Sequence, residues 1–219
     1  MFERNNERQL MVENQIKARG IKDEKVLEAM RKVPRHLFVP KDLRNQAYED
    51  HPIHIGYSQT ISQPYIVAFM TELCELEKHS KVLEVGSGCG YQSAILAEIC
   101  SAVFSIEIVC PLAERAKKTL NKLGYGNVIM KCGDGYSGWE RAAPFDAIIV
   151  AAAPETIPQK LLDQLADGGK MIIPVGKYNQ NLKKITRKGD EFIEEHILPV
   201  RFVPMTGKIQ NSSKKSGNI

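Results

Sequence analysis

The sequence has no hydrophobic run that approaches the roughly 18 apolar residues of a membrane-spanning helix. Its first residues, MFERNNERQL, are charged from the third position and contain no apolar core, so they do not resemble a secretory signal. The formal net charge of +4 is too small to indicate nucleic-acid binding, and no basic stripe alternates with aromatic residues. These absences predict a cytoplasmic protein with no membrane or nucleic-acid partner.

The sequence also lacks a C-x-x-C pair. Five cysteines are scattered along it: Cys74, Cys89, Cys100, Cys110 and Cys132. An odd number without metal-ligand spacing predicts reduced thiols that are mostly packed in the interior. His51 and His54 form an H-x-x-H, but only Glu49 and Asp50 lie near them in the sequence. We therefore predict no metal site.

The element pattern changes near Lys81, and there are no internal repeats. Residues 5–32 predict one or two helices broken at Gly20, residues 41–62 an irregular polar connection, and a helix begins at Gln63-Pro64. Beyond Lys81, strands are predicted at 81–86, 102–108, 127–134, 145–153, 170–176, around 182–187 and at 191–203. Helices are predicted between them at 91–100, 111–124 and 157–165.

Strands that alternate with helices, and that are themselves almost continuously apolar, predict an α/β fold with a doubly wound, mostly parallel sheet covered on both faces. The 219 residues suffice for one substantial core. We expect a single domain over residues 1–207, with N-terminal helices and a polar turn in 1–80 and the sheet in 81–207. Residues 208–219 are polar and predict a disordered tail. Ligands of such sheets bind beyond the carboxyl ends of the strands.

Three strand ends carry residues suited to one ligand. The segment LEVGSGCGY places Gly86, Gly88 and Gly90 after the first strand, which ends at Glu84. The spacing is G-x-G-x-G, and Tyr91 stands where a dinucleotide fingerprint needs a small residue, so a nicotinamide oxidoreductase is disfavoured.

Acids follow at the ends of the next two strands. Glu107 is placed to accept hydrogen bonds from both hydroxyls of a ribose, and Asp134 to accept from an adenine amino group. No P-loop lysine follows the glycines, so a triphosphate is not expected. A nucleoside without phosphates fits better, and S-adenosylmethionine is such a ligand.

Several longer segments give the chain a specific resemblance over residues 5–207. They are VPRHLFVP, YEDHPIHIGYSQTISQPYIVAFM, VLEVGSGCGYQSAILAE, GDGYSGW, FDAIIVAAAPETIP, GGKMIIPVG and RFVPMTG. Together they resemble the protein-L-isoaspartate O-methyltransferases. QTISQP and RFVPMTG are the most specific segments, because many methyltransferases share the glycine loop. Ser58 stands where many members have Gly, and Asp167 where Pro is common.

The resemblance implies transfer of a methyl group from S-adenosylmethionine to the free carboxylate of L-isoaspartyl residues. The cofactor becomes S-adenosylhomocysteine, and the methyl ester begins the repair of the residue through a succinimide. The resemblance also implies a seven-stranded sheet with an altered order of the last strands, and isoaspartyl proteins and peptides as partners. Our default expectation for the oligomeric state is a small monomer. Ser62 is implied as the catalytic residue. Substrate binding is implied at Ser58, Thr60, Ser62 and Val203. Cofactor binding is implied at Thr60, Ile61, Glu84, Gly86, Ser87, Gly88, Gly90, Glu107, Ile108, Gly133, Asp134 and Gly135.

The chemistry agrees with a turn that offers hydroxyls and amides. A carboxylate with a pKa of about 4 is already ionised at pH 7, so methyl transfer to it needs alignment and desolvation but no general base. Ser62 is placed either to cap the following helix or to orient the acceptor carboxylate at the helix start.

Other functions remain open on the sequence alone. An amino-group methyltransferase would carry a D/N-P-P-Y-type motif after the fourth strand, where this chain has AAAPE. A methyltransferase for another carboxylate or small molecule shares the glycine loop. A non-catalytic module would bind the cofactor without transferring its methyl group.

Overall fold

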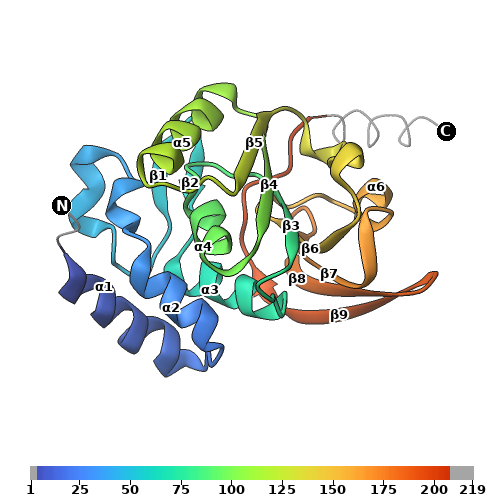
Figure 1. Ribbon diagram of the computed structural model, residues 1–219, viewed down its shortest axis with the longest axis horizontal. Helices are drawn as coiled ribbons and strands as arrows, with labels where there is room; N and C mark the ends of the chain where they lie inside the picture. The colour runs from blue at the N-terminus through green and yellow to red at the C-terminus, as the bar shows by residue number, and fades with distance from the viewer. Residues whose placement is uncertain (1–3, 208–219) are drawn as a thin grey trace.

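The described part of the chain, residues 4–207 of this computed structural model, is built around a seven-stranded sheet with helices against it (Figure 1). The strand order is β5-β4-β3-β6-β7-β8-β9. Their bounds are β3 Lys81–Val85, β4 Ala102–Glu107, β5 Val128–Cys132, β6 Phe145–Val150, β7 Leu165–Val175, β8 Gln180–Lys188 and β9 Glu191–Val200. Strands β3 to β7 are parallel, whereas β8 and β9 are each antiparallel to the strand before them. The predicted sheet and its altered C-terminal order are therefore confirmed, while the predicted tail lies outside the described residues.

Helices form the N-terminal part and pack against the sheet. Their bounds are α1 Asn5–Met11, α2 Glu24–Lys32, α3 Pro64–Leu73, α4 Tyr91–Ile99, α5 Cys110–Lys122 and α6 Gln159–Leu162. Helical turns continue α1 to Arg19, and Gly20 then breaks the chain direction with a left-handed φ of 99°. Helix α2 contacts both α3 and α4 (Figure 1). Within residues 4–207, no helix has the length and apolar character needed to cross a membrane.

The buried apolar residues form two clusters, and alternation along the strands separates them. Val82 belongs to the larger cluster together with residues of α2, α3 and α4. Leu83 and Val85 belong to the smaller cluster together with Leu161 of α6. Since successive side chains of a strand point to opposite faces, Glu84 shares the face of Val82 and is directed toward α4.

The prediction of an irregular connection over residues 41–62 is wrong in part, because this segment contains an antiparallel ribbon. Strand β1 (Ile53–Gly56) pairs with β2 (Gln59–Ile61). Buried and exposed residues alternate along β1, which is the period of a strand with one covered face. The run is only four residues long, and the polar residues around it conceal the pattern.

Two residues close this ribbon. Tyr57 and Ser58 have φ angles of 53° and 57°, the backbone of a type I′ hairpin turn. Glycine adopts such angles more easily than any other residue, so Ser58 takes a backbone conformation that suits Gly better.

The helix predicted over residues 157–165 is also shorter than expected. Helix α6 ends at Leu162, and β7 begins at Leu165, which pairs with Phe145 of β6. Both of these side chains are fully buried, so packing favours an early start of the strand. The register then shifts before Lys170, and Gly168 takes a left-handed φ of 74° inside the strand rather than closing a helix.

Candidate active site

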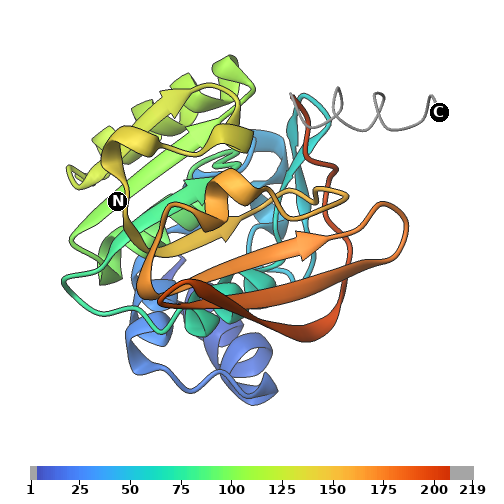
Figure 2. The same cartoon turned by 90° about the vertical axis from the view of Figure 1, so that its right-hand side faces the viewer.

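A cleft of about 900 Å³ opens at the carboxyl ends of the central strands. Its walls are the glycine loop after β3, the turn from β2 into α3, and the chain that follows β9, which Figure 2 shows (red) rising past these strand ends. The predicted site residues that line it are Thr60, Ile61, Ser62, Gly86, Ser87, Gly88, Glu107, Ile108, Gly135 and Val203. The predicted residues outside the lining are Ser58, Glu84, Gly90, Gly133 and Asp134.

The glycine loop turns from β3 into α4 through left-handed backbone. Gly86, Gly88 and Gly90 have φ angles of 90°, 52° and 86°, which residues with a Cβ rarely adopt. A Cβ on Gly90 would lie 3.1 Å from the Cβ of Ala116 in α5. Gly90 therefore allows close packing against α5, whereas Gly86 and Gly88 face the cleft.

Glu107 at the end of β4 holds two loops together. Its Oε2 accepts the N–H of Gly88 at 2.7 Å, and its Oε1 accepts the N–H of Val109 at 2.9 Å. The side chain is only 4% exposed, yet it lines the cleft. A carboxylate oxygen can accept more than one hydrogen bond, so the group can still receive two ribose hydroxyls. The exposed side chain of Ile108 provides an apolar surface beside it.

Glu84, the last residue but one of β3, is fully buried on the α4 face of the sheet. Its Oε2 accepts hydrogen bonds from Ser93 Oγ and, at 2.6 Å, from Ser105 Oγ. Burial raises the pKa of the Glu84 carboxyl to about 7, although the two hydroxyls act in the opposite direction. This placement does not support a direct contact with the cofactor. The carboxyl instead joins β3, β4 and α4 beneath the glycine loop.

The residues predicted at the end of β5 also have structural partners. Gly133 donates its N–H to the main-chain oxygen of Glu107 at 2.9 Å. Asp134 Oδ1 accepts the N–H of Tyr136 at 2.9 Å. The carboxylate of Asp134 also lies close to Gly207, where a Cβ would be 2.7 Å from Asp134 Cγ. Asp134 therefore borders the last part of the RFVPMTG segment.

Gly135 lines the cleft directly. A Cβ at this position would lie 2.3 Å from Val85 Cγ1, so no larger residue fits unless the side chain of Val85 shifts. The close approach brings the loop after β5 against the end of β3.

The turn before α3 contributes Thr60, Ile61 and Ser62 to the cleft, whereas Ser58 is exposed at the tip of the ribbon. The alternative in which Ser62 caps α3 is wrong. The helix begins at Pro64, its N-cap residue is Gln63, and no side chain accepts a hydrogen bond there. Proline at the first helical position has no N–H that needs a partner, so the helix start does not require a capping hydroxyl.

The segment after β9 is held over the cleft by main-chain hydrogen bonds. Ala153 N–H donates to Val203 O, and Met205 N–H donates to Ala153 O, both at 2.8 Å. The buried side chain of Gln180 binds Phe202 twice, accepting its N–H at 2.6 Å and donating to its carbonyl at 3.1 Å. These bonds place Val203 in the wall of the cleft, where the RFVPMTG motif predicted it.

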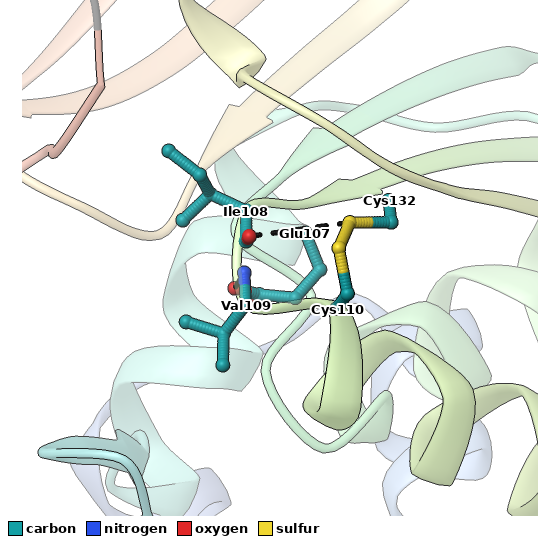
Figure 3. The surroundings of a disulfide bond; sticks show 5 residues. All are labelled: Glu107, Ile108, Val109, Cys110 and Cys132. Atoms are coloured by element: carbon teal, nitrogen blue, oxygen red, sulfur yellow. Dashed lines mark hydrogen bonds between the residues drawn. A yellow bond between two sulfur atoms is a disulfide. The ribbon is translucent and has the colours of Figure 1, made fainter.

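The prediction that all cysteines are reduced is wrong for two of them. Cys110 and Cys132 form a disulfide, while Cys74, Cys89 and Cys100 are free and buried. Glu107 of β4 pairs with Cys132 of β5, and Cys110 begins α5 directly after β4 (Figure 3). Parallel neighbouring strands end at the same edge of a sheet, so residues 22 positions apart meet with their Cα atoms 5.1 Å from each other.

Other residues that line the cleft were not predicted from the sequence. The guanidinium of Arg19 lies 3.7 Å from the ring centroid of Tyr65, and Arg19 Nη1 is 3.0 Å from Asp50 Oδ2. Arg19, Tyr65 and the whole stretch 198–206 line the cleft. Within this stretch only Val203 was predicted. No local pattern marks Arg19, because its place depends on how the N-terminal helices pack against α3.

The arrangement suits binding and alignment more than proton transfer. Glu107 is the sole carboxylate, and no histidine occurs, among the described residues that line the cleft. No group of three or more His, Cys, Asp or Glu within residues 4–207 is arranged to hold a metal ion.

Comparisons with known proteins agree on one family. The sequence model described as protein-L-isoaspartate(D-aspartate) O-methyltransferase matches residues 5–210. A protein-L-isoaspartate O-methyltransferase of Opitutus terrae is 54% identical over 205 residues, which cover 93% of this chain and 88% of that protein. One from Picosynechococcus sp. is 55% identical over 200 residues, covering 91% and 90%.

Solved structures give the same result. A protein-L-isoaspartate O-methyltransferase structure superposes with a TM-score of 0.85 at 27% identity, over 96% of this chain and 68% of that one. A beta-aspartate methyltransferase from Plasmodium falciparum, in complex with S-adenosyl-L-homocysteine, has a TM-score of 0.79 at 28% identity, over 91% and 98% of the two chains.

Proposed function

The chain belongs to the protein-L-isoaspartate O-methyltransferase family, and from this premise we propose which residues of the cleft perform the reaction. The enzyme transfers the methyl group of S-adenosyl-L-methionine to the free carboxylate of L-isoaspartyl residues in damaged proteins, initiating their return through a succinimide to L-aspartyl. The observation that carries the residue assignment is that Ser62 and Glu107 line the same cleft.

The cofactor side is formed by the glycine loop and the ends of β4 and β5. Gly86, Ser87 and Gly88 offer a surface without bulky side chains, and Glu107 supplies buried carboxylate oxygens for a ribose. Ile108 and Gly135 flank the place for a purine ring. The donor and acceptor set therefore fits S-adenosyl-L-methionine, which when bound supplies a methyl group on a sulfonium. We assign Glu84, Gly90, Gly133 and Asp134 to the support of these loops.

The acceptor side is the turn before α3. Thr60, Ile61 and Ser62 line the cleft there, and Val203 lines it from the segment that follows β9. The first turn of a helix has N–H groups without intrahelical partners and the positive end of the helix dipole, which favours a carboxylate. We assign Ser62 the role of orienting the acceptor oxygen by donating a hydrogen bond.

The isoaspartyl carboxylate needs no base, since a group with a pKa of about 4 is ionised at neutral pH. The cleft supplies no histidine among its described lining residues, which agrees with this chemistry. Apolar side chains such as Ile61, Val67 and Met70 exclude water around the reacting groups. Alignment of the two reactants in such a site can lower the barrier by up to roughly 7–11 kcal/mol.

Ser62→Ala tests the assignment. Loss of a hydrogen bond to a charged group should lower kcat/KM for an isoaspartyl peptide about 10- to 100-fold, while the Kd for S-adenosylhomocysteine stays unchanged. Ser101→Ala is the control for loss of a serine hydroxyl, because Ser101 donates its hydroxyl to main-chain oxygens just before β4, at the amino edge of the sheet and away from the cleft. Full activity of Ser62→Ala would remove Ser62 from the mechanism.

We further propose that residues 1–207 act as one methyltransferase domain, as a cytoplasmic monomer on protein substrates, without a nucleic-acid partner. The Cys110–Cys132 disulfide is uncommon for that compartment, where thiols are kept reduced. Both of its cysteines are exposed, so cellular dithiols can reach the bond.

A further inference from the structure

Arg35 is the arginine within residues 4–207 that has 0% exposure, and it lies directly behind the acceptor turn. Its Nε donates to Ala47 O and its Nη2 donates to Ser62 O, both at 2.8 Å. Its Cζ lies 4.9 Å from the ring centroid of Tyr91, the first residue of α4 after the glycine loop. One side chain therefore connects the acceptor turn with the cofactor loop.

No carboxylate compensates this buried charge among the groups that face it. The titratable groups that raise its pKa are Tyr91, Cys89 and Tyr48. His51 has a raised pKa, mainly because of a hydrogen bond with a main-chain oxygen, and the charge of Arg35 acts against this rise. Burial raises the pKa of Cys89 to about 11 and also raises the pKa values of both tyrosines, so all three are neutral at pH 7. Burial lowers the pKa of Arg35, but a guanidinium stays protonated in proteins. Its Nη1 is buried and makes no hydrogen bond of ordinary geometry within residues 4–207, although the hydroxyl of Tyr91 lies close enough to favour the charge.

Two carbonyl oxygens and the ring of Tyr91 hold the guanidinium, but none of these groups carries a negative charge. A buried charge without an opposite charge is costly, so the position of Arg35 suits an anion that arrives with a ligand. Ser62, Cys89 and Tyr91, which surround Arg35, all line the cleft. We propose that Arg35 is a positioning and specificity residue: its charge selects an anionic acceptor, and its Nη2 fixes the main chain at Ser62. The inference rests on the proposed function, because the anion is the isoaspartyl carboxylate.

The same charge distinguishes substrate from product. The acceptor oxygen bonds to the methyl carbon while the methyl–sulfur bond breaks and its electron pair goes to sulfur. The acceptor thereby becomes a neutral ester, and its attraction to Arg35 is lost. The buried cation thus favours binding of the acid and release of the ester.

The test compares two peptides that differ only in charge, one with L-isoaspartate and one with L-isoasparagine, whose free carboxylate is an amide. Calorimetry on protein saturated with S-adenosylhomocysteine gives both Kd values. We expect the wild type to prefer the acid by at least about 10-fold. The preference should fall close to one in Arg35→Met and be largely kept in Arg35→Lys, which retains the charge. In Arg35→Lys kcat should still fall, because a lysine cannot reproduce the two hydrogen bonds that the guanidinium donates to the main-chain oxygens of Ala47 and Ser62.

Arg187→Met is a matched control. Arg187 also donates to two main-chain carbonyls, those of Leu165 and Gly189, but it lies outside the cleft lining. An acid-to-amide ratio that stays unchanged in Arg35→Met while both Kd values rise together would reduce Arg35 to a structural role. If the wild type binds the acid and the amide peptide with nearly equal Kd values, the inference is overturned whatever the variants show. A wild type that does not methylate isoaspartyl peptide at all overturns the proposed function, and this inference with it.

Discussion

Two carboxylates at neighbouring strand ends behave differently because different groups surround them. Glu107 accepts two main-chain N–H groups and reaches the cleft. Glu84 accepts two serine hydroxyls, faces α4 and is wholly buried. Glu84 is level with Ser105, two positions before Glu107, so the two carboxylates lie on the same face of the sheet and differ in how far along the strands they stand. Glu84 therefore stays beneath the glycine loop, whereas Glu107 reaches the cleft.

The raised pKa of Glu84 makes stability depend on pH. Between its ordinary pKa near about 4.5 and the folded value of about 7, the folded protein binds more protons than the unfolded chain, so stability falls as pH rises. Glu84→Gln cannot titrate. The unfolding free energy of the wild type, relative to this variant, should therefore drop by about 3 kcal/mol from pH 5 to pH 8.

Urea denaturation of both proteins at pH 5 and pH 8, without ligand, measures this difference. Ser105→Ala provides a second comparison, because it removes a hydroxyl that stabilises the charged carboxyl and should steepen the decline. Parallel pH profiles for wild type and Glu84→Gln would show that Glu84 ionises as an ordinary carboxyl does.

The elements around the cofactor side are tied together at the carboxyl ends of β4 and β5. The disulfide joins Cys132, the last residue of β5, to Cys110, the first of α5. In Figure 3 the Ile108 side chain extends away from the bond, while its main-chain oxygen lies 4.0 Å from Cys132 Sγ. The bond therefore holds the loop that presents Glu107 and Ile108 to the cleft.

Removing this crosslink should destabilise the protein. With the two cysteines 22 positions apart, the loop-entropy relation gives about 3 kcal/mol for the double variant Cys110→Ser/Cys132→Ser. Chemical denaturation without reductant measures it, and the Kd for S-adenosylhomocysteine should rise as the Glu107 loop loosens. Thiol titration of the denatured wild type under the same conditions should find the three free cysteines, and five reactive thiols would contradict the bond.

At the scale of the whole molecule, the sequence predicts the sheet and the place of the cleft because these depend on local periodicity. Apolar runs that end in a glycine or an acidic residue mark the strand ends, and the carboxyl ends of parallel strands lie at the same edge of the sheet. The direction of Glu84, the place of Arg19 and the Cys110–Cys132 bond depend on which strands and helices become neighbours. That information is not local, so the sequence alone left these features unpredicted or wrong.

The walls of the cleft come from three segments that lie apart in the sequence. The N-terminal ribbon and α3 supply the acceptor turn, β3 to β5 supply the cofactor side, and residues 198–206 complete the enclosure. The central claim is that this single cleft joins S-adenosylmethionine to an isoaspartyl carboxylate.

The most direct test uses two peptides that differ at one residue, L-isoaspartate in one and L-aspartate in the other. Each is incubated with the protein and S-adenosylmethionine labelled in its methyl group, and base-labile methyl ester is counted. We expect label on the isoaspartyl peptide alone. Equal label on both peptides, or none on either while S-adenosylhomocysteine still binds, would contradict the account.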